Sequence, residues 1–426
     1  MTSRSPEVSA RAAPGLRERA NAEAVEHMWA ADPVLVDVRP ALEAVPGMSE
    51  RTILTSGAPL AWDEYVGGQR SGIIGGALFQ GLAADAEDAD AKIRAGEIEV
   101  RICHDLGCTG SLAGIYTASM PVLVVENRPA GNRSFCNLFE GPSPQRLNYG
   151  LYNETVRESL LFLQDVVGPV LGEAVRLLGG IPLRPIIRRA LHMGDELHSR
   201  NTAATLLFTR ELFPALLELG GRSPEPVRQV LDYLRSSDYF FLRLSMASSK
   251  VTADAAHRVE GASVVSAMTF NCRDFSIRVS GLGDEWFSAP LPQVEAKLFE
   301  GYTESDIEFM GGESVINETV GLGGFAQAAA FPLQDYQGGS AERMAEMNLA
   351  MYEITVGEHP EYKIPYFGFR GTPTGIDVHR VVESGITPAM DIGVAGRGGG
   401  QIGAGVLRAP LACFTAAVDA YGRRYT

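Results

Sequence analysis

A histidine, an aspartate and two cysteines lie close together early in the chain, and a histidine beside an aspartate is suited to proton transfer. The run Cys103-His104-Asp105 follows a segment typical of a strand and precedes a glycine-containing loop, Thr109-Gly-Ser. A histidine beside an aspartate at a strand end can be oriented for acid–base work, and the glycines expose backbone N–H groups. The alternative is a histidine that merely satisfies a loop carbonyl. Both interpretations stay open, and we take His104 as a candidate catalytic residue.

The segment HMGDELHSRN is dense in functional side chains. Helical spacing would put His192 and Glu196 on one face and Asp195 near His198. Such a cluster could bind a divalent metal. It could equally form a polar helix face or a salt-bridged seam between domains. We take Asp195 and Glu196 as candidate catalytic residues and Asn201 as a candidate binding residue.

Arginines beside glycine loops form a third group. Arg273 lies in the run NCRD, and Arg278 precedes the loop SGLGD, which contains Gly281 and Gly283. A guanidinium group next to open backbone can hold a carboxylate or a phosphate through paired N–H donors. These four residues are candidate anion-binding residues.

A fourth group combines two stretches of the last third, ESVINETVGLGG and RGTPTGID. Both offer hydroxyl groups and open backbone beside a charge. Tight turns with capping threonines explain either stretch alone, but turns do not require clustered Arg, Glu and Asn. We take Glu318 as a candidate catalytic residue. The candidate residues for substrate or anion binding are Asn317, Thr319, Gly323, Gly324, Arg370, Thr372, Thr374 and Asp377.

Motifs of the common nucleotide-binding and hydrolytic enzymes are missing from the sequence. It contains no GxxxxGK[ST], no GxSxG and no HExxH. The run GLGGFA at 321–326 fits the weak dinucleotide pattern GxGxxA, but the polar residues before it are poor for a buried parallel strand. This favours a loop whose backbone approaches another backbone or an anionic ligand.

Composition narrows the function classes further. The chain of 426 residues has 52 acidic and 37 basic side chains, a net charge of −15, which disfavours nucleic acid and anionic membranes as partners. No apolar run approaches the roughly 18 residues that a membrane helix requires. The five cysteines form no CxxC pair, which is typical of reduced thiols in a cytosolic protein. We therefore expect a cytoplasmic protein.

The distribution of glycine predicts the domain organisation. Of 47 glycines, only seven lie in residues 151–250, where apolar residues recur at helical spacings, whereas 23 lie in residues 281–426. Short apolar runs on either side, such as 34–38, 121–125, 264–269 and 352–356, are typical of strands. We predict a mixed α/β, more strictly α+β, fold: glycine-rich α+β domains at 1–152 and 251–426, with a helical domain at 153–250 between them.

Read together, long segments of the chain resemble the YlbE-like family, which includes the AllG-type subunit of bacterial oxamate carbamoyltransferase. They run in family order from about residue 21 to residue 414 and include SMPVLVVEN, MGDELHSRNTAAT, SGLGDEWFSAP, GESVINETVGLGGFA and FRGTPTGIDVHRVVESG. The resemblance implies two α+β domains with a helical domain between them. It also implies a chain that acts with two partner proteins to convert oxalurate and phosphate to oxamate and carbamoyl phosphate.

For this chain the resemblance implies a carbamoyltransferase-like enzyme with a small anionic substrate, and with phosphate or carbamoyl phosphate as a further substrate. No cofactor is certain, and a divalent metal is an option. The resemblance also implies a homo-oligomer, or a hetero-oligomer with partner subunits. The chain departs from the family pattern at CHDL (103–106), TGSLAG (109–114) and FNCRDFSI (270–277). These departures leave two alternatives: a diverged amide-bond hydrolase or ligase, or a non-catalytic subunit.

Overall fold

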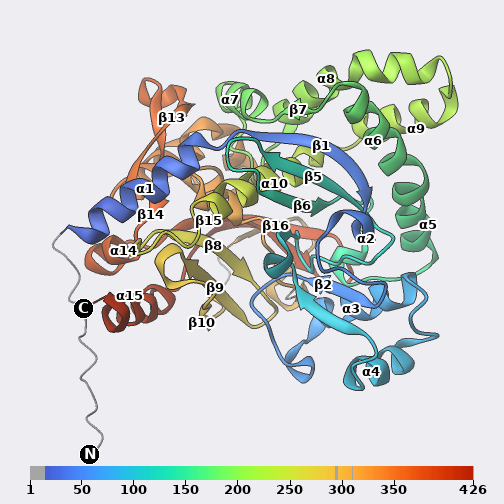
Figure 1. Cartoon of the computed structure of the whole chain (residues 1–426), viewed down its shortest axis with the longest axis horizontal. Helices are drawn as coiled ribbons and strands as arrows, with labels where there is room; N and C mark the ends of the chain where they lie inside the picture. Colours follow the sequence, from blue (N-terminus) through green and yellow to red (C-terminus); the bar gives the residue numbers. More distant parts are fainter. Residues whose placement is uncertain (1–14, 293–295, 309, 426) are drawn as a thin grey trace, which may run out of the picture.

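The computed structural model describes residues 15–292, 296–308 and 310–425. Helices surround several small sheets, which confirms the predicted mixed α+β fold. In Figure 1 the helices that follow residue 153, drawn in green, lie along the top and right of the molecule. Within the described ranges, no helix is long and apolar enough to cross a bilayer. The domain boundaries at 153 and 251 stay a prediction.

The largest sheet lies near the middle of the molecule, with the strand order β4-β6-β5-β1-β7. Strand β5 is apolar on both faces: Leu123 and Val125 pack toward the helices, whereas Val122 and Val124 pack toward the short elements of the N-terminal part. This two-sided burial explains the continuous apolar run. The strands are β1 Pro33–Pro40, β4 Cys108–Thr109, β5 Pro121–Asn127, β6 Arg133–Asn137 and β7 Ile181–Pro182.

The other N-terminal elements flank this sheet. Two strands, β2 Thr52–Thr55 and β3 Glu99–Ile102, pair in parallel. The chain leaves β3 directly into a 3₁₀ turn at Cys103–Leu106, so His104 follows a strand as predicted. The helices of this part are α1 Leu16–Ala30, α2 Ala41–Ala44, α3 Gly67–Phe79 and α4 Ala86–Arg94.

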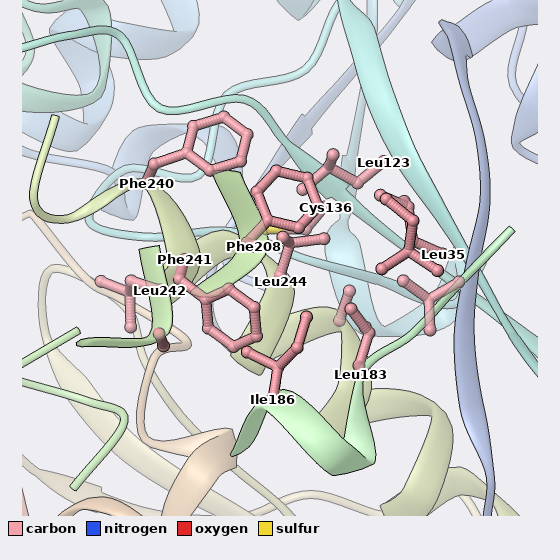
Figure 2. Packing of buried hydrophobic residues seen from close by; sticks show 14 of the residues in the cluster. Leu35, Leu123, Cys136, Leu183, Ile186, Phe208, Phe240, Phe241, Leu242 and Leu244 are labelled. Carbon is pink, nitrogen blue, oxygen red and sulfur yellow. The ribbon is translucent and has the colours of Figure 1, made fainter. Parts of the chain in front are cut away.

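Helices fill the glycine-poor stretch, as their periodicity predicts. They are α5 Glu154–Phe162, α6 Gly168–Leu177, α7 Arg184–His192, α8 Thr202–Gly220, α9 Pro224–Arg235 and α10 Phe240–Ala255. Helix α10 packs on β5 and β6 and is buried along nearly its whole length. Its Phe240 and Phe241 meet Phe208 of α8, and Figure 2 shows this part of the core. The same helix also buries two cationic side chains, Arg243 and Lys250.

Antiparallel strands dominate the last third of the chain. The sheet β10-β9-β8 and the sheet β11-β16-β15-β12 are accompanied by the hairpin β13-β14. The strand predicted at 352–356 begins only at Thr355, because a helix extends to Met351. The strands are β8 Val265–Phe270, β9 Asp274–Val279, β10 Phe287–Pro290, β11 Ala296–Leu298, β12 Ile307–Glu308, β13 Thr355–Ile364, β14 Arg370–Ile376, β15 Ala389–Gly396 and β16 Gln401–Arg408. The helices are α11 Ile316–Thr319, α12 Gln334–Gln337, α13 Ala341–Met351, α14 Val378–Ser384 and α15 Leu411–Tyr425.

The first helix and the last third of the chain are joined by a buried polar contact. In Figure 1 helix α1 lies beside the hairpin β13-β14. Asn21 of α1 donates to Asp377 and to Ser263, and the Ser263 hydroxyl donates to Asp377 over 2.8 Å. Asp377 therefore connects elements that are far apart in the sequence.

The segment between α7 and α8 is a loop, so the expected helical face of His192 and Glu196 is wrong. Helix α7 ends at His192, and Gly194 then takes a φ of +96°, which a helix cannot contain. The Asp195 carboxylate accepts a hydrogen bond from the backbone N–H of Ala204, in the first turn of α8. The acid thus satisfies a free N–H group at a helix start instead of continuing a helix.

Candidate functional site

A histidine–carboxylate pair lies where the loop between α7 and α8 meets α11. The carboxylate of Glu318, on α11, accepts from His198 Nδ1 at 2.7 Å and from the backbone N–H groups of Gly324 and Asp391 at 3.1 and 3.0 Å. Both side chains of the pair are buried. Because an ionised carboxylate only accepts hydrogen bonds, it holds the proton of a neutral His198 on Nδ1. Nε2 then carries no proton and can act as a base.

Glycines let the 321–324 loop approach this pair. Gly323 has a φ of +58°, and a Cβ there would lie 2.3 Å from Glu318 Oε1. A Cβ on Gly324 would lie 2.2 Å from the backbone oxygen of Ala389 on β15. Both glycines therefore permit the close approach that the sequence predicts for this loop.

Two further buried carboxylates complete what we call the His198 cluster: His198, Glu318, Glu196 and Asp391. Glu196 accepts from the backbone N–H groups of His198, Ser199 and Arg200. Asp391, on β15, accepts from the side-chain amides of Gln327 and Gln337 at 2.6 to 2.8 Å. The cluster is thus held by donors from several separate parts of the chain.

Burial and mutual repulsion shift the pKa values of the His198 cluster. Burial raises the pKa of Asp391 to about 6. Burial and the nearby Asp391 charge also place the pKa of Glu196 well above its ordinary value. Burial alone would lower the pKa of His198, but the adjacent Glu318 carboxylate outweighs it, and the net pKa is raised. The cluster therefore contains groups that can exchange protons near neutral pH.

The His198 cluster borders a cavity of about 200 Å³, which we call the first cavity. His198, Ser199 and Asp391 line it together with two arginines, Arg146 and Arg243. Polar groups from distant parts of the chain, among them the hydroxyls of Ser111 and Ser314, complete the lining. A small anionic molecule would thus meet cations and an acid–base pair in one space.

The two arginines lack carboxylate partners among the described residues. Arg243, only 4% exposed, donates to the amide oxygen of Asn137 at 3.3 Å, and its Nε has no partner. Arg146 donates to a backbone oxygen at 2.6 Å and stacks over Phe139 and Tyr149. A buried guanidinium without a counter-charge is costly, and an anionic ligand would remove that cost.

The backbone beside the first cavity is strained at two leucines. Leu112, which lines the cavity, has a φ of +55°, and Leu197, next to His198, has a φ of +73°. The backbone oxygen of Leu197 accepts from the Asn317 amide at 3.0 Å and from the Ser245 hydroxyl. Such strain persists only where surrounding contacts impose it. Asn317 is therefore a positioning residue for the loop that carries His198.

Several predicted site residues gather around the His198 cluster. Asp195, whose pKa burial raises to about 6, lies in the same loop and faces Arg200 at 3.5 Å. Asn201 donates to the backbone oxygen of His198 at 2.8 Å. The residues that the structure brings together here are Asp195, Glu196, Asn201, Asn317, Glu318, Gly323 and Gly324.

Other predicted residues have local structural contacts. The Thr319 hydroxyl bonds to the backbone oxygen of Ile316. Thr372 and Thr374 pack against Gly321, where a Cβ would lie 2.7 and 2.8 Å from their hydroxyl oxygens. Asp377 accepts from the backbone N–H of His379 at the start of α14, in addition to its contacts with α1.

The remaining predicted residues lie apart from the first cavity. Arg273 pairs with Glu64 at the surface, and Arg370 pairs with Glu358 at 2.7 Å while stacking on a tyrosine. The loop with Gly281 and Gly283 packs by its backbone: Gly281 N–H donates to Ala262 O at 2.9 Å, and Gly283 has a φ of +69°. His104 and Arg278 line a different, larger cavity.

Sequence reasoning did not select Arg146, Arg243 or Asp391 as site residues, and it named His198 only as a neighbour of Asp195 in a cluster that could bind a divalent metal. Two of these residues could have been recognised from the sequence. Arg243 is a single charge in the apolar run FFLRLSM, and Asp391 is one in PAMDIGV. A charge inside a buried segment is rare unless it is paired or functional.

The His198 cluster also contains a set of donors that could hold a metal ion. His198, Glu318 and Asp391 offer ligand atoms that all lie within 4.8 Å of one another. Imidazole and carboxylate suit a divalent transition metal, and Glu318 Oε2 has no hydrogen-bond partner in the part of the chain that the structure describes. The other oxygens of Glu318 and Asp391 already accept from N–H groups, so the fit is partial.

Comparisons with known proteins agree with the predicted resemblance to AllG-type chains. The family model described as oxamate carbamoyltransferase subunit AllG matches residues 98–314. The chain is 39% identical over 407 residues to the oxamate carbamoyltransferase subunit AllG of Escherichia coli (strain K12), covering 94% of this chain and 97% of that protein. It is 40% identical over 408 residues to the uncharacterized protein YahG of the same organism, covering 95% and 86%.

A solved structure extends this likeness to the fold. The crystal structure of a conserved protein of unknown function from Enterococcus faecalis V583 superposes with a TM-score of 0.93 at 37% sequence identity, covering 97% of this chain and 100% of that chain. The broader name YlbE-like stays a prediction. From the relatives, the matched family model and the shared fold, this chain belongs to the family of oxamate carbamoyltransferase subunit AllG.

Proposed function

We propose that this chain is a catalytic subunit of a carbamoyltransferase that acts on a small ureido acid of the oxalurate type. Membership of the AllG family supports this proposal. The observation that carries it is the composition of the first cavity, where two arginines without carboxylate partners meet a histidine oriented by a buried glutamate. Two adjacent anions, a carboxylate and a phosphate, would satisfy these arginines.

The proposed reaction transfers the carbamoyl group from a nitrogen to a phosphate oxygen. A phosphate oxygen attacks the carbamoyl carbon and forms the new C–O bond, and the C–N bond to the oxamate nitrogen breaks. Monoprotonated phosphate loses its proton, and the departing nitrogen gains one. His198 Nε2 accepts the first proton and donates the second, while Glu318 stabilises the charged ring. Arg146 and Arg243 hold the two anions in contact, which lowers the barrier by positioning.

The decisive assay measures carbamoyl phosphate formed from oxalurate and phosphate by the chain assembled with its partner subunits. We expect the substitution His198→Gln to lower the turnover rate about 100-fold or more, the usual contribution of a general acid–base group. The matched control is His27→Gln, at an exposed position of α1, which should leave turnover unchanged. Full turnover by H198Q would contradict the proposed role of His198.

The same assay separates the two alternatives. Release of ammonia from oxalurate without phosphate would identify an amide-bond hydrolase, in which the histidine–glutamate pair activates water instead of phosphate. Turnover by the partner subunits that is unaffected by H198Q and by Arg243→Gln would identify a non-catalytic subunit. Dialysis against a chelator, followed by addition of Mn²⁺, would show whether the His198 cluster uses a metal.

A further inference from the structure

A second cavity, of about 570 Å³, lies at the far end of α10 from the first. Lys250 and Asp254 of α10 line it, together with Arg278 of β9 and Trp286 just before β10. Lys250 stands seven residues after Arg243, which corresponds to about 10 Å along a helix. The two cavities are therefore separate spaces beside one buried helix.

Cations exceed carboxylates in the lining of the second cavity. Three aspartates, Asp105, Asp254 and Asp284, face four basic residues, Arg101, Lys250, Arg258 and Arg278. This local excess of positive charge contrasts with the net charge of −15 for the whole chain. The lining is therefore one of the places where an acidic protein can attract an anion.

The cations of the second cavity are buried more deeply than their partners. The Lys250 side chain is 3% exposed and that of Asp254 is 28% exposed, and the two are joined at 2.6 Å. The Arg278 side chain is 10% exposed and that of Asp105 is 42% exposed, again joined at 2.6 Å. The positive groups thus lie inside, while water reaches the carboxylates. An entering anion can share the buried cations while the aspartates keep their hydration.

Two residues of the lining, His104 and Trp286, contain buried polar atoms without partners among the described residues. The His104 side chain is fully buried with Nε2 3.8 Å from Glu313 Oε1, and neither of its ring nitrogens has a hydrogen-bond partner in the described ranges. Its ring lies edge-on to Trp286 at 5.4 Å between centroids, and the indole Nε1 of Trp286 is also unpartnered. The Arg278 guanidinium stacks over the same indole at 4.2 Å. Buried donors without acceptors are rare in folded proteins, and a ligand with several acceptor oxygens would satisfy them.

We propose that the second cavity is a binding site for a phosphate group, held by Arg278 and Lys250 and by the N–H groups of His104 and Trp286. The site is distinct from the first cavity and does not depend on the proposed carbamoyl transfer. A tetrahedral dianion offers acceptors in several directions, which suits a guanidinium, an ammonium and two ring donors. The cavity volume leaves room for the organic part of a phosphate ester.

Tryptophan fluorescence tests this site directly, because Trp286 is one of only three tryptophans in the chain. The full chain is titrated with inorganic phosphate in one series and with glycerol 3-phosphate in another. We expect a saturable change of emission that is absent in Trp286→Phe and that needs at least 10-fold more ligand in Arg278→Gln. Tighter binding of glycerol 3-phosphate would identify a phosphate ester as the natural class, and tighter binding of inorganic phosphate would identify the free ion.

Two controls separate this site from its surroundings and from the first cavity. Arg273→Gln removes an exposed arginine five residues before Arg278, and Arg243→Gln removes the buried arginine of the first cavity. Neither should shift the midpoint of the Trp286 signal. Calorimetry on the wild-type chain, which does not depend on the folding of any variant, should detect bound phosphate, and R243Q should keep the phosphate of the second cavity. The proposal fails if R278Q keeps the wild-type midpoint, if R243Q abolishes the signal, or if the wild-type chain binds no phosphate.

Discussion

Arg243 and Lys250 occupy the same buried helix, and their surroundings differ in one decisive respect. Lys250 has a carboxylate partner one turn further along, Asp254, whereas Arg243 has no carboxylate partner among the described residues and donates to an amide oxygen at 3.3 Å. A buried cation with an internal counter-charge does not depend on a ligand for its stability, although it can share an anion that enters. A buried cation without one needs a ligand to offset its desolvation. The comparison supports the proposal that the first cavity binds an anion, whereas the cations of the second cavity are partly neutralised within the chain.

The acidic groups of the two cavities differ in the same way. In the His198 cluster, which borders the first cavity, the carboxylates of Glu196 and Glu318 accept mainly from backbone N–H groups, and Asp391 accepts from the side-chain amides of Gln327 and Gln337. In the second cavity the aspartates pair with cationic side chains instead of backbone groups. Rigid donors suit catalysis, which depends on fixed distances, and paired side chains suit exchangeable binding. We therefore expect chemistry in the first cavity and reversible binding in the second.

The largest effect that this comparison predicts is for Arg243→Met. In the carbamoyl-transfer assay of the proposed complex, loss of the guanidinium should lower kcat/KM about 100-fold or more, because the proposed buried contact to an anion is removed. The free chain should keep its stability or gain some, since an unpaired buried charge disappears. Activity assays and urea unfolding measure the two quantities on one variant. The exposed Arg235→Met is the control, and unchanged activity in R243M would remove Arg243 from the site.

A further prediction concerns Glu313, which lies between the linings of the two cavities. It is fully buried, accepts from the N–H groups of Gly57 and Gly110, and lies 3.8 Å from His104 of the second cavity. The next residue, Ser314, lines the first cavity. Burial raises the pKa of Glu313 from 4.5 to about 8. The folded chain therefore keeps a proton here at neutral pH that the unfolded chain releases.

The resulting prediction is a pH-dependent difference between the wild-type chain and Glu313→Gln. Between pH 4.5 and 8 unfolding releases this proton, so the Glu313 contribution to stability falls as the pH rises, by at most about 1.4 kcal/mol per pH unit. The free energy of unfolding of E313Q lacks this dependence on pH. The amide of the variant faces the Gly110 N–H in place of a carboxyl oxygen, and this lowers its stability by the same amount at every pH. Urea unfolding from pH 5 to 8 should show that the stability of E313Q rises relative to that of the wild type. The stability of the control Glu87→Gln, at an exposed position, should change with pH in the same way as that of the wild type. Parallel curves for E313Q would mean that Glu313 is ionised in the folded chain.

The sequence predicts the two sites unequally, for physical reasons. The fold class follows from periodicity and from the uneven glycine, and Gly323 and Gly324 could be recognised as points of close backbone approach. Glu318 could be selected as an acid, but its contact with His198 spans 120 residues of chain, and no local pattern encodes it. Arg243 has the surroundings of a core helix and so escapes a search for polar motifs. The helical face expected for His192 failed because Asp195 caps the next helix.

The smallest predicted effect, and the sharpest test of the comparison, is that of Lys250→Met. The two oxygens of Asp254 contact Lys250 Nζ at 2.6 and 2.7 Å, so the substitution leaves a carboxylate without its cation. Because Asp254 is partly hydrated, we expect a loss of about 1–3 kcal/mol, less than for a fully buried pair. The double variant K250M/D254N should recover part of that loss, and urea unfolding measures both. Arg243→Met and Lys250→Met remove a cation from the same buried helix, yet only the second should destabilise the free chain. Equal losses would show that both cations have a structural role, and the inference that Arg243 binds an anion in the first cavity would fail.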